Sequence, residues 1–367
     1  MVLIGSNTAT GRVKEEKPRM AERVLRWGIL STADIARKKV VPGMHKAARC
    51  KVVAVGSRNG EQARAFALEL GIARAHDSYE ALLADPDVDA VYIPLPNHLH
   101  REWTIAAARA GKHVLCEKPL ALTASEAEEM VAACEREGVR LMEAFMYRLH
   151  PSWAAARQLL ASGRIGRLQT VQSWFSYYND DPRNIRNIAE AGGGALFDIG
   201  CYTINLSRML FGAEPERVEA AILRDPDMEI DVLTSGLLVF PGGGTATFTV
   251  STRSESDQRV HIYGTEGRIS IGIPFNIPPD RPTQIFVTQG GDPPVAPNTE
   301  TLTFPTADPY TVETEAFAAA ILDGTPTPTP PADGVANLRV IEAVFAAADG
   351  RGAQGVPASP DGVAPGA

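Results

Sequence analysis

The chain of 367 residues lacks several features that would indicate particular classes of protein. It has no excess of positive charge, and its net charge of −8 argues against nucleic acid as the main partner, because phosphate binding needs a basic surface. Its four cysteines show no CxxC spacing, so we expect reduced buried thiols and no metal site. No apolar run approaches the ~18 residues that would span a bilayer as a helix.

The N-terminal segment lacks the apolar stretch that an export signal places after its positive charges. We therefore expect neither a secretory signal nor a twin-arginine leader, and we expect a cytoplasmic protein. Residues 1–24 are polar, charged and aperiodic, which indicates an extended arm or, equally well, a disordered tail. Residues 350–367 are of low complexity, and we predict that they are disordered.

What the chain does contain is a regular alternation of strand-like and helical segments that begins at Leu25. Such alternation indicates a parallel sheet with crossover helices, and a chain of this length suits two domains. We predict an α/β Rossmann domain over residues 25–148. Its expected strands are Leu25–Leu30, Lys51–Ser57, Asp89–Pro94, Lys112–Cys116 and Val139–Met142, and its expected helices are Gly60–Leu70, His98–Ala110 and Thr123–Glu137.

The pattern changes near residue 149, where strand-like runs begin to follow one another without intervening helices. This indicates an α+β C-terminal domain with an open, mostly antiparallel sheet over residues 149–349, for substrate binding and oligomerisation. Proline and glycine dominate residues 274–308, for which we expect a long loop or an irregular edge. The expected elements are helices Ser152–Ser162, Leu196–Leu210, Thr311–Leu322 and Gly334–Ala348, strand Leu168–Tyr178, and several strands between Arg217 and Ile273.

The turn after the first strand reads WGILSTADIARK and has the position of a dinucleotide-binding loop. Only Gly28 stands where glycine is usual, because Ser31 and Ala33 occupy the other two places. These small residues still leave room, and backbone N–H groups at the helix start would bind a phosphate. The alternative is an ordinary strand-to-helix turn. The candidate cofactor-binding residues in this turn are Ser31, Thr32, Ala33, Asp34 and Ile35.

The end of the second strand, VVAVGSRN, distinguishes between the two nicotinamide dinucleotides. An acidic residue at this place would bind the ribose 2′-hydroxyl of NAD, and none is present. Ser57 and Arg58 instead offer a hydroxyl and a bidentate cation, which suit a 2′-phosphate. We therefore predict NADP as the cofactor, against the alternative that Arg58 is a solvated loop cation.

Polar residues also follow the strand that ends near residue 94, where the sequence reads PLPNHLH. Loops at the carboxyl ends of strands form the ligand crevice of an open α/β sheet. An ordinary helix start is the alternative interpretation for the histidines. The candidate cofactor contacts from this loop are Leu95, Pro96, Asn97 and His100.

In HVLCEKP, residues 113–119, two charges end a strand that otherwise reads as buried. Charged side chains are rarely buried unless they are paired or functional. Lys118 would reach both a substrate and the nicotinamide, and Glu117 would orient it or bind the nicotinamide ribose. The alternative is a structural ion pair, although adjacent strand residues point to opposite faces.

The segment AEAGGGALFDIGCYTIN places three glycines before a helix that carries Asp198 and Tyr202. Their i,i+4 spacing puts both side chains on one helix face. A tyrosine near a lysine exchanges protons readily, because the cation stabilises the phenolate and lowers its pKa from about 10. Asp198 would accept a hydrogen bond from a substrate hydroxyl. The alternative is a packing helix on which Asp198 is exposed.

Together, the weak glycine turn, PLPNHLH, EKP and GGGALFDIGCY resemble the glucose–fructose oxidoreductase, inositol dehydrogenase and rhizopine-catabolism family, over residues 25–349. The resemblance implies a Rossmann domain, an open sheet, and hydride transfer between a nicotinamide and a sugar or polyol carbon. It implies that Lys118, Asp198 and Tyr202 are catalytic. Many members have histidine at the last position, so Tyr202 is similar to the glucose–fructose oxidoreductase branch.

The segments MEAFMYRLHP and DPRNIRN also resemble that branch. Its glycine turn tolerates the departures at Ser31 and Ala33, and an arm before its Rossmann domain helps to retain NADP. The resemblance therefore implies that this chain keeps its cofactor bound. It further implies substrate contacts from Lys118, Tyr147, Arg148, Asp198 and Tyr202, and a cofactor contact from Arg186.

The expected enzyme is an aldose–aldose oxidoreductase, which oxidises one aldose at C1 to the aldonolactone and reduces a second to the alditol. The alternatives are a conventional NADP-dependent aldose 1-dehydrogenase, a trans-dihydrodiol dehydrogenase, and a non-catalytic regulator that senses NADP. Runs such as LTSGLLVF and TATFTVST leave one sheet face that helices need not cover. We therefore expect at least a homodimer through that face, with small-molecule sugars as the other partners and neither nucleic acid nor membrane.

Overall fold

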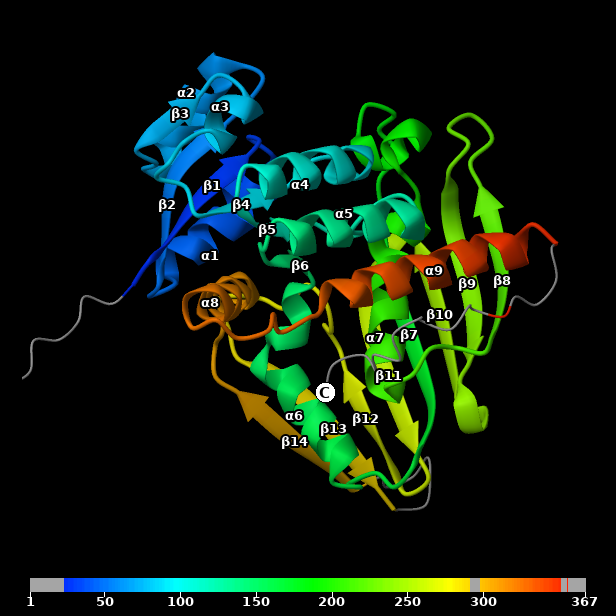
Figure 1. Cartoon of the computed structure of the whole chain (residues 1–367). Coiled ribbons are helices and arrows are strands. Elements are labelled where there is room, and N and C mark those ends of the chain that lie inside the picture. Colours follow the sequence, from blue (N-terminus) through cyan, green and yellow to red (C-terminus); the bar gives the residue numbers. More distant parts are fainter. Residues whose placement is uncertain (1–22, 291–297, 351–354, 356–367) are drawn as a thin grey trace, which may run out of the picture.

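The computed structural model describes residues 23–290, 298–350 and 355, and its strands form two separate sheets (Figure 1). The first sheet is parallel throughout and has the order β3-β2-β1-β4-β5-β6. The order reverses between β1 and β4, where the carboxyl ends of the strands border the usual ligand crevice. The strands are β1 (Leu25–Leu30), β2 (Cys50–Gly56), β3 (Arg74–His76), β4 (Ala90–Ile93), β5 (His113–Cys116) and β6 (Leu141–Glu143).

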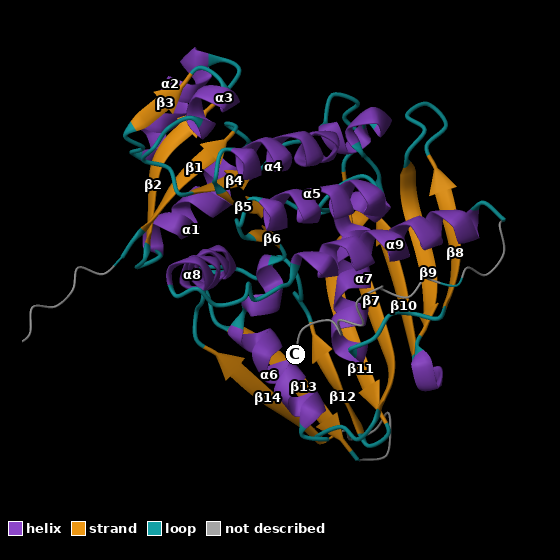
Figure 2. Cartoon of the chain, viewed as in Figure 1, coloured by secondary structure: helices purple, strands orange, loops and turns teal. Residues whose placement is uncertain are grey.

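Helices cover both faces of this sheet, so its central strands are apolar on both sides (Figure 2). Trp27, Ile29 and Leu30 of β1 are fully buried. The first crossover contains a π-helical stretch, η1 (Ala36–Val40), before it continues as α1. The other helices are α1 (Val41–Lys46), α2 (Gly60–Leu70), α3 (Tyr79–Leu83), the 3-10 turn η2 (Asn97–Leu99), α4 (His100–Arg109) and α5 (Ala124–Arg136).

The second sheet is antiparallel except where β10 pairs with β7, and it has the order β14-β13-β12-β11-β7-β10-β9-β8. Alternate residues of β7 and β10, such as Val171, Phe175, Phe248 and Val250, are buried against its helices. The strands are β7 (Leu168–Tyr178), β8 (Arg217–Arg224), β9 (Asp231–Val239), β10 (Thr245–Ser251), β11 (Arg253–Gly264), β12 (Gly267–Ile271), β13 (Thr283–Gln289) and β14 (Asn298–Phe304).

The last two helices join the halves of the molecule. Helix α8 (Pro309–Leu322) returns to the first sheet, where Phe317 packs on Trp27 with ring centroids 5.7 Å apart. Helix α9 (Pro331–Ala348) packs along α5, α7 and β8 (Figure 1). The remaining elements are η3 (Met146–Leu149), α6 (Pro151–Ala161), η4 (Ile185–Asn187), η5 (Ala189–Ala191), the π-helical η6 (Leu196–Gly200), α7 (Cys201–Phe211) and η7 (Pro241–Gly243).

The predicted fold class is confirmed, and most expected elements occur within two residues of their predicted limits. The interpretation of residues 274–308 as a loop or irregular edge is wrong in part, because β13 and β14 lie there. β14 is the edge strand of the sheet and β13 is its neighbour, and both contain several polar residues, so their apolar signal is weak. The short β3 and α3 were also not predicted. The predicted arm and tail fall almost wholly outside the described residues.

In the part of the chain that the structure describes, every helix is too short or too polar to cross a membrane.

Candidate active site

A cavity of about 1070 Å³ lies where the carboxyl ends of β1, β4 and β5 face the second sheet. Three segments predicted from strand ends meet in its wall: residues 33–35 after β1, 94–97 after β4 and 117–118 after β5. The facing wall comes from β7, η4, η6, α7, β11 and the start of α8. Parallel strands bring their carboxyl ends to one edge of a sheet, which is why residues so distant in sequence converge.

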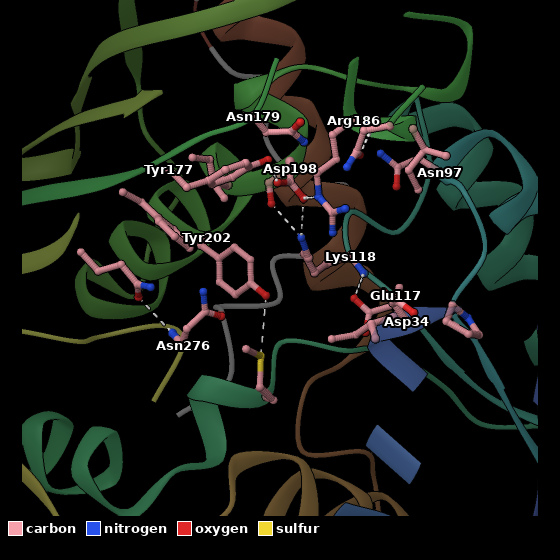
Figure 3. Close-up of a pocket in the computed structure, with 18 of the residues that line it drawn as sticks. Asp34, Asn97, Glu117, Lys118, Tyr177, Asn179, Arg186, Asp198, Tyr202 and Asn276 are labelled. Carbon is pink, nitrogen blue, oxygen red and sulfur yellow. Dashed lines mark hydrogen bonds and ion pairs between the residues drawn. The ribbon is translucent and has the colours of Figure 1, made fainter. Parts of the chain in front are cut away.

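Lys118, Asp198 and Tyr202 form the centre of this cavity (Figure 3). Lys118 Nζ donates to the Asp198 carbonyl oxygen at 2.7 Å and lies 3.3 Å from its carboxylate Oδ1. The same ammonium lies over the ring of Tyr202, 4.9 Å from its centroid. Burial opposes the charge of Lys118, but the Asp198 carboxylate raises its pKa, so the side chain is an ammonium ion at neutral pH.

Two further side chains hold the Asp198 carboxylate. Arg186 Nε lies 3.1 Å from Oδ1, and the Tyr177 hydroxyl donates to Oδ2 at 2.5 Å. Burial alone would favour the neutral acid, but Arg186 and Lys118 outweigh it and hold the pKa of Asp198 well below its usual range. Asp198 is therefore a fixed anion between two cations, and it is a poor proton acceptor.

The glycine run before Asp198 is required by close backbone packing. Gly194 has a φ of +115°, and a Cβ there would lie 2.1 Å from Asp231 Oδ1. Gly194 N–H donates to the Arg186 carbonyl at 2.9 Å, and Leu196 N–H donates to Asp231 Oδ2 at 2.7 Å. These contacts fix both the loop that carries Arg186 and the start of η6. The π-helical turn then places Asp198, and π turns recur at functional sites.

The environment of Tyr202 differs from the expectation of a lowered pKa. Its side chain is 5% exposed, and its hydroxyl donates to Met146 Sδ at 3.6 Å. Burial, followed by the charge of Glu117, raises the pKa of Tyr202 well above its ordinary value. The Lys118 ammonium faces the ring and does not compensate for the loss of water. Tyr202 is therefore a neutral phenol with its proton available for donation.

Glu117 lies at the end of β5 and lines the same cavity. The fully buried Tyr92 donates its hydroxyl to Glu117 Oε1 at 2.5 Å, and the backbone N–H of Lys118 donates to Oε2 at 3.3 Å. Burial raises the pKa of Glu117, although Lys118 and Arg186 oppose this shift. The carboxylate thus faces the cavity from a position fixed by β4 and β5.

The other end of the cavity has the donors that a dinucleotide requires. Ala33, Asp34 and Ile35 line it at the helix start after β1, and the Asp34 charge is compensated by Lys38 at 2.6 Å. Ser31 has a φ of 138°, and its hydroxyl accepts from Ala33 N–H at 3.0 Å, so it shapes this turn. Thr32 is partly exposed beside it. Backbone donors with a compensated carboxylate are compatible with a pyrophosphate.

Ser57 and Arg58 stand at the end of β2, as predicted, but outside the cavity wall. Ser57 is 6% exposed and accepts from Asn59 N–H at 3.2 Å, whereas Arg58 is exposed. A hydroxyl and a guanidinium at this position, with no carboxylate among residues 56–60, are the donor set that fits a 2′-phosphate. The residues present therefore fit NADP.

Only some of the predicted residues in the loop after β4 line the cavity. Leu95 and Asn97 line the cavity, and Asn97 Nδ2 donates to the Gly192 carbonyl at 2.9 Å, which links the two walls. Pro96 lies next to them but is not part of the wall. His100 does not face the cavity: it is fully buried, and its ring nitrogens contact the Pro119 and Leu95 carbonyls at 2.9 and 2.8 Å. Burial lowers its pKa to about 4, although the two carbonyl acceptors oppose this shift, and the ring links the two loops.

Tyr147 and Arg148 also lie away from the cavity, contrary to the expectation of substrate contacts. Both are buried, and the Tyr147 hydroxyl donates to Asn205 Oδ1 at 2.7 Å. Arg148 Nη1 forms an ion pair with Asp333 Oδ2 at 2.6 Å. This pair connects η3 to α9 and leaves neither side chain free for a substrate.

Several polar residues of the cavity wall were not among the predicted site residues. Tyr177 is one of them, and the alternating pattern of its strand, β7, was the sequence signal that could have indicated it. Gln258 accepts from Asn276 N–H at 3.0 Å and fixes the far rim. The others are Ser176, Asn179, Asn184, Ser256, Asp257 and Tyr310. Within the described ranges, no cluster of three or more His, Cys, Asp or Glu side chains could hold a metal ion.

Comparison with known protein families gives two adjacent matches. Residues 25–145 match the GFO/IDH/MocA oxidoreductase family with its NAD-binding Rossmann fold, and residues 153–270 match the GFO/IDH/MocA C-terminal domain. An uncharacterized oxidoreductase of Rhizobium meliloti is 46% identical over 89% of this chain and 97% of its own length. A D-xylose 1-dehydrogenase (NADP⁺) of Haloferax volcanii is 39% identical over 88% of this chain and 97% of its own.

Solved structures resemble the whole fold. The aldose–aldose oxidoreductase of Caulobacter crescentus, complexed with glycerol, has a TM-score of 0.83 at 31% identity, covering 91% of this chain and 100% of that chain. A 3-ketoreductase of Actinomadura kijaniata, in complex with NADP and TDP-benzene, has a TM-score of 0.83 at 31% identity, covering 89% and 98%.

Proposed function

The chain belongs to the GFO/IDH/MocA oxidoreductase family, and within it we propose that this NADP-dependent enzyme oxidises a cyclic aldose at C1 to the aldonolactone. The coarser statement, an oxidoreductase that uses NADP, follows from the family and from its NADP-dependent relatives. The more specific proposal, oxidation of an aldose at C1, rests on one observation. Lys118, Asp198 and Tyr202 converge on a cavity whose opposite wall is rich in amide and hydroxyl side chains.

Such a wall suits a polyhydroxylated ring. Asn179, Asn184, Ser256 and Asn276 offer both donors and acceptors, which is what vicinal hydroxyls need. A dihydrodiol has only two hydroxyls on an otherwise apolar ring and would need mostly apolar walls, so this composition supports a sugar over a dihydrodiol. The identity between this chain and the D-xylose 1-dehydrogenase supports oxidation at C1 in particular.

The proposed roles follow from the charge states of the three side chains. NADP, when held by the residues after β1 and β2, would supply the hydride acceptor for C1 in its oxidised form and the hydride donor in its reduced form. Tyr202 exchanges the proton of the C1 oxygen: it donates from the phenol in reduction and accepts in oxidation. The Lys118 ammonium over its ring stabilises negative charge on either oxygen. Asp198 is held as an anion, accepts a hydrogen bond from a sugar hydroxyl and orients the ring.

A second, finer proposal is that NADP(H) stays bound and that a second aldose, reduced to its alditol, regenerates it. The fold shared with the aldose–aldose oxidoreductase supports this cycle. The arm that would retain the cofactor lies outside the described residues. The alternative is a conventional aldose 1-dehydrogenase that exchanges its cofactor at every turnover, and a non-catalytic NADP sensor is the alternative without chemistry.

One experiment separates these functions. Full-length protein is purified without added nucleotide, its near-ultraviolet absorbance is recorded, and glucose or xylose is added. Bound NADP(H) with equal yields of lactone and alditol supports the retained cofactor, and deletion of residues 2–22 should then make turnover depend on added NADP. Empty protein that reduces added NADP with sugar oxidation supports the simple dehydrogenase. Absence of any sugar-dependent change, with NADP bound, would contradict the proposed catalysis.

We make two further predictions about this protein that the structure does not test. The chain is proposed to form at least a homodimer through the face of the second sheet that lies opposite its helices. It is also proposed to act in the cytoplasm on small sugars.

A further inference from the structure

One buried carboxyl near the cavity has no part in the proposed chemistry. Glu313 lies on α8 and is 2% exposed, and its Oε1 has no hydrogen-bond partner among the described residues. It follows Tyr310, a residue of the cavity wall, by one helical turn, so both side chains share the helix face that meets the first sheet. Buried polar atoms are almost always paired, so an unpaired carboxyl at this place needs an explanation.

The surroundings of Glu313 favour its neutral form. Burial, and then the charge of Glu117, raise its pKa well above the ordinary value. Tyr92 and Tyr310 face the same group and are themselves acids whose pKa values are raised, first by burial, with Glu117 and Glu313 among the further causes. Glu117 differs, because it has a hydrogen bond from Tyr92 and lies near Lys118 and Arg186.

No described cation on the neighbouring elements compensates Glu313. On its own helix, Glu315 points elsewhere and accepts from Ala48 N–H at 3.0 Å. The charged groups of the other elements that pack on α8 have partners of their own or face solvent: Arg37 with Glu69, Lys38 with Asp34, Lys39 and Lys51 exposed, His45 with the Leu70 carbonyl, Lys46 with Asp308, and Arg148 with Asp333.

The oxidised cofactor would supply the positive charge that the surroundings of Glu313 lack. Glu117 and Tyr310 line the same cavity as Lys118 and Tyr202, and the proposed hydride transfer would bring the nicotinamide to these last two residues. The oxidised nicotinamide is a cation, whereas the reduced ring is neutral. We propose that Glu313 is a proton site coupled to the charge of the cofactor: it keeps its proton beside NADPH and releases it to solvent when NADP⁺ binds.

The step breaks only the O–H bond of the Glu313 carboxyl and transfers its proton to water, and no electrons move. Its consequence is a difference between the two cofactor forms. Raising the pH favours the ionised carboxyl and therefore tightens NADP⁺, while NADPH binding gains nothing from it. This inference needs the cofactor alone. It can therefore fail while sugar oxidation is confirmed, and it can hold if the substrate proves to be another alcohol.

The test is isothermal titration of nucleotide-free, full-length protein with NADP⁺ and with NADPH near neutral pH, in two buffers of different protonation enthalpy. The difference between the two titrations cancels any proton exchanged by the 2′-phosphate, which titrates near pH 6. We expect NADP⁺ to release up to one proton more than NADPH. The ratio of their dissociation constants should shift toward NADP⁺ by up to tenfold per pH unit, the slope that one linked proton gives.

The decisive variant is Glu313→Gln, which keeps the shape and a donor but cannot ionise. It should abolish the extra proton release and make the ratio of the two dissociation constants independent of pH. Glu315→Gln, on the same helix, should behave as the unchanged protein. Equal proton release in Glu313→Gln and the unchanged protein would overturn the proposal. If Glu313→Gln does not fold, as judged by circular dichroism, a pH-independent ratio in the unchanged protein would overturn it as well.

Discussion

Replacing Asp198 with asparagine should remove the anion that two cations share while keeping the shape of the side chain. Lys118 Nζ and Arg186 Nε approach Oδ1 at 3.3 and 3.1 Å, and the Tyr177 hydroxyl donates to Oδ2 at 2.5 Å. An asparagine has one acceptor oxygen and one NH₂ group. The oxygen would face the cations and the NH₂ would face Tyr177, so the geometry survives and the charge is lost.

The size of the effect can be worked from these contacts. At an effective dielectric constant of about 20, unit charges at such distances attract by about 5 kcal/mol, which is an upper bound. Arg186 is 43% exposed, so water screens its share. Losing the charge-assisted hydrogen bond of the more buried Lys118 costs about 1.5–3 kcal/mol. At about 1.4 kcal/mol per factor of ten, that predicts a loss of about 10- to 150-fold in kcat/KM.

The assay compares kcat/KM for an aldose with the dissociation constant of NADP in Asp198→Asn. We expect the first to fall by this factor and the second to stay unchanged, because Asp198 is proposed to orient the sugar. Asp280→Asn, at an exposed carboxylate paired with Arg281 at 3.0 Å, is the matched control and should keep full activity. Full activity in Asp198→Asn, or a loss confined to NADP binding, would refute this reasoning.

Four further predictions can be tested separately. Tyr202→Phe should lower turnover by at least about 100-fold with NADP still bound, and unchanged turnover would move the proton transfer elsewhere. Because burial raises the pKa of Tyr202 well above its ordinary value, sugar oxidation, which needs the proton-accepting form, should accelerate with rising pH without levelling off at about 10, while reduction stays level. Arg58→Ala should weaken NADP by about 1.5–3 kcal/mol and NAD hardly at all, measured by titration, and equal losses would make Arg58 structural. Light scattering at micromolar concentration should give at least a dimer, and a monomer would contradict the proposed sheet interface.

Local patterns in the sequence were sufficient to place Lys118 at a strand end, and Asp198 and Tyr202 on one helix, for physical reasons. Strand periodicity and glycine stops locate Lys118 at the end of a parallel strand, and all such ends share one edge of a sheet. The i,i+4 spacing places Asp198 and Tyr202 on one helix face even though part of that helix is a π turn. Their meeting with Lys118 came from the family resemblance, because no local pattern specifies how the two domains dock.

Residues whose environment depends on distant partners could not be placed in this way. His100, Tyr147 and Arg148 are polar residues in promising segments, yet all three are buried. His100 contacts the Leu95 and Pro119 carbonyls, and Tyr147 and Arg148 contact Asn205 and Asp333, which are far away in sequence. Conversely, α8 carries Tyr310 into the cavity wall from a segment more than a hundred residues beyond Tyr202. A polar residue on a predicted helix gives no local sign of which of these two environments it will meet.

The upward shift of the Tyr202 pKa also depends on packing against distant residues, and it affects how the site transfers protons. A tyrosine near a lysine was expected to ionise easily, but the ammonium lies over the ring and the hydroxyl rests on the Met146 sulfur at 3.6 Å. Thioether sulfur is a weak acceptor, so a sugar oxygen arriving at that position would displace it at little cost. The phenol proton is then held by the stronger acceptor, beside an ammonium that stabilises the negative charge left behind. Burial thus keeps the proton on Tyr202 until a substrate oxygen is present to share it, which favours the reduction, whereas the oxidation depends on the phenolate that the Lys118 ammonium has to stabilise.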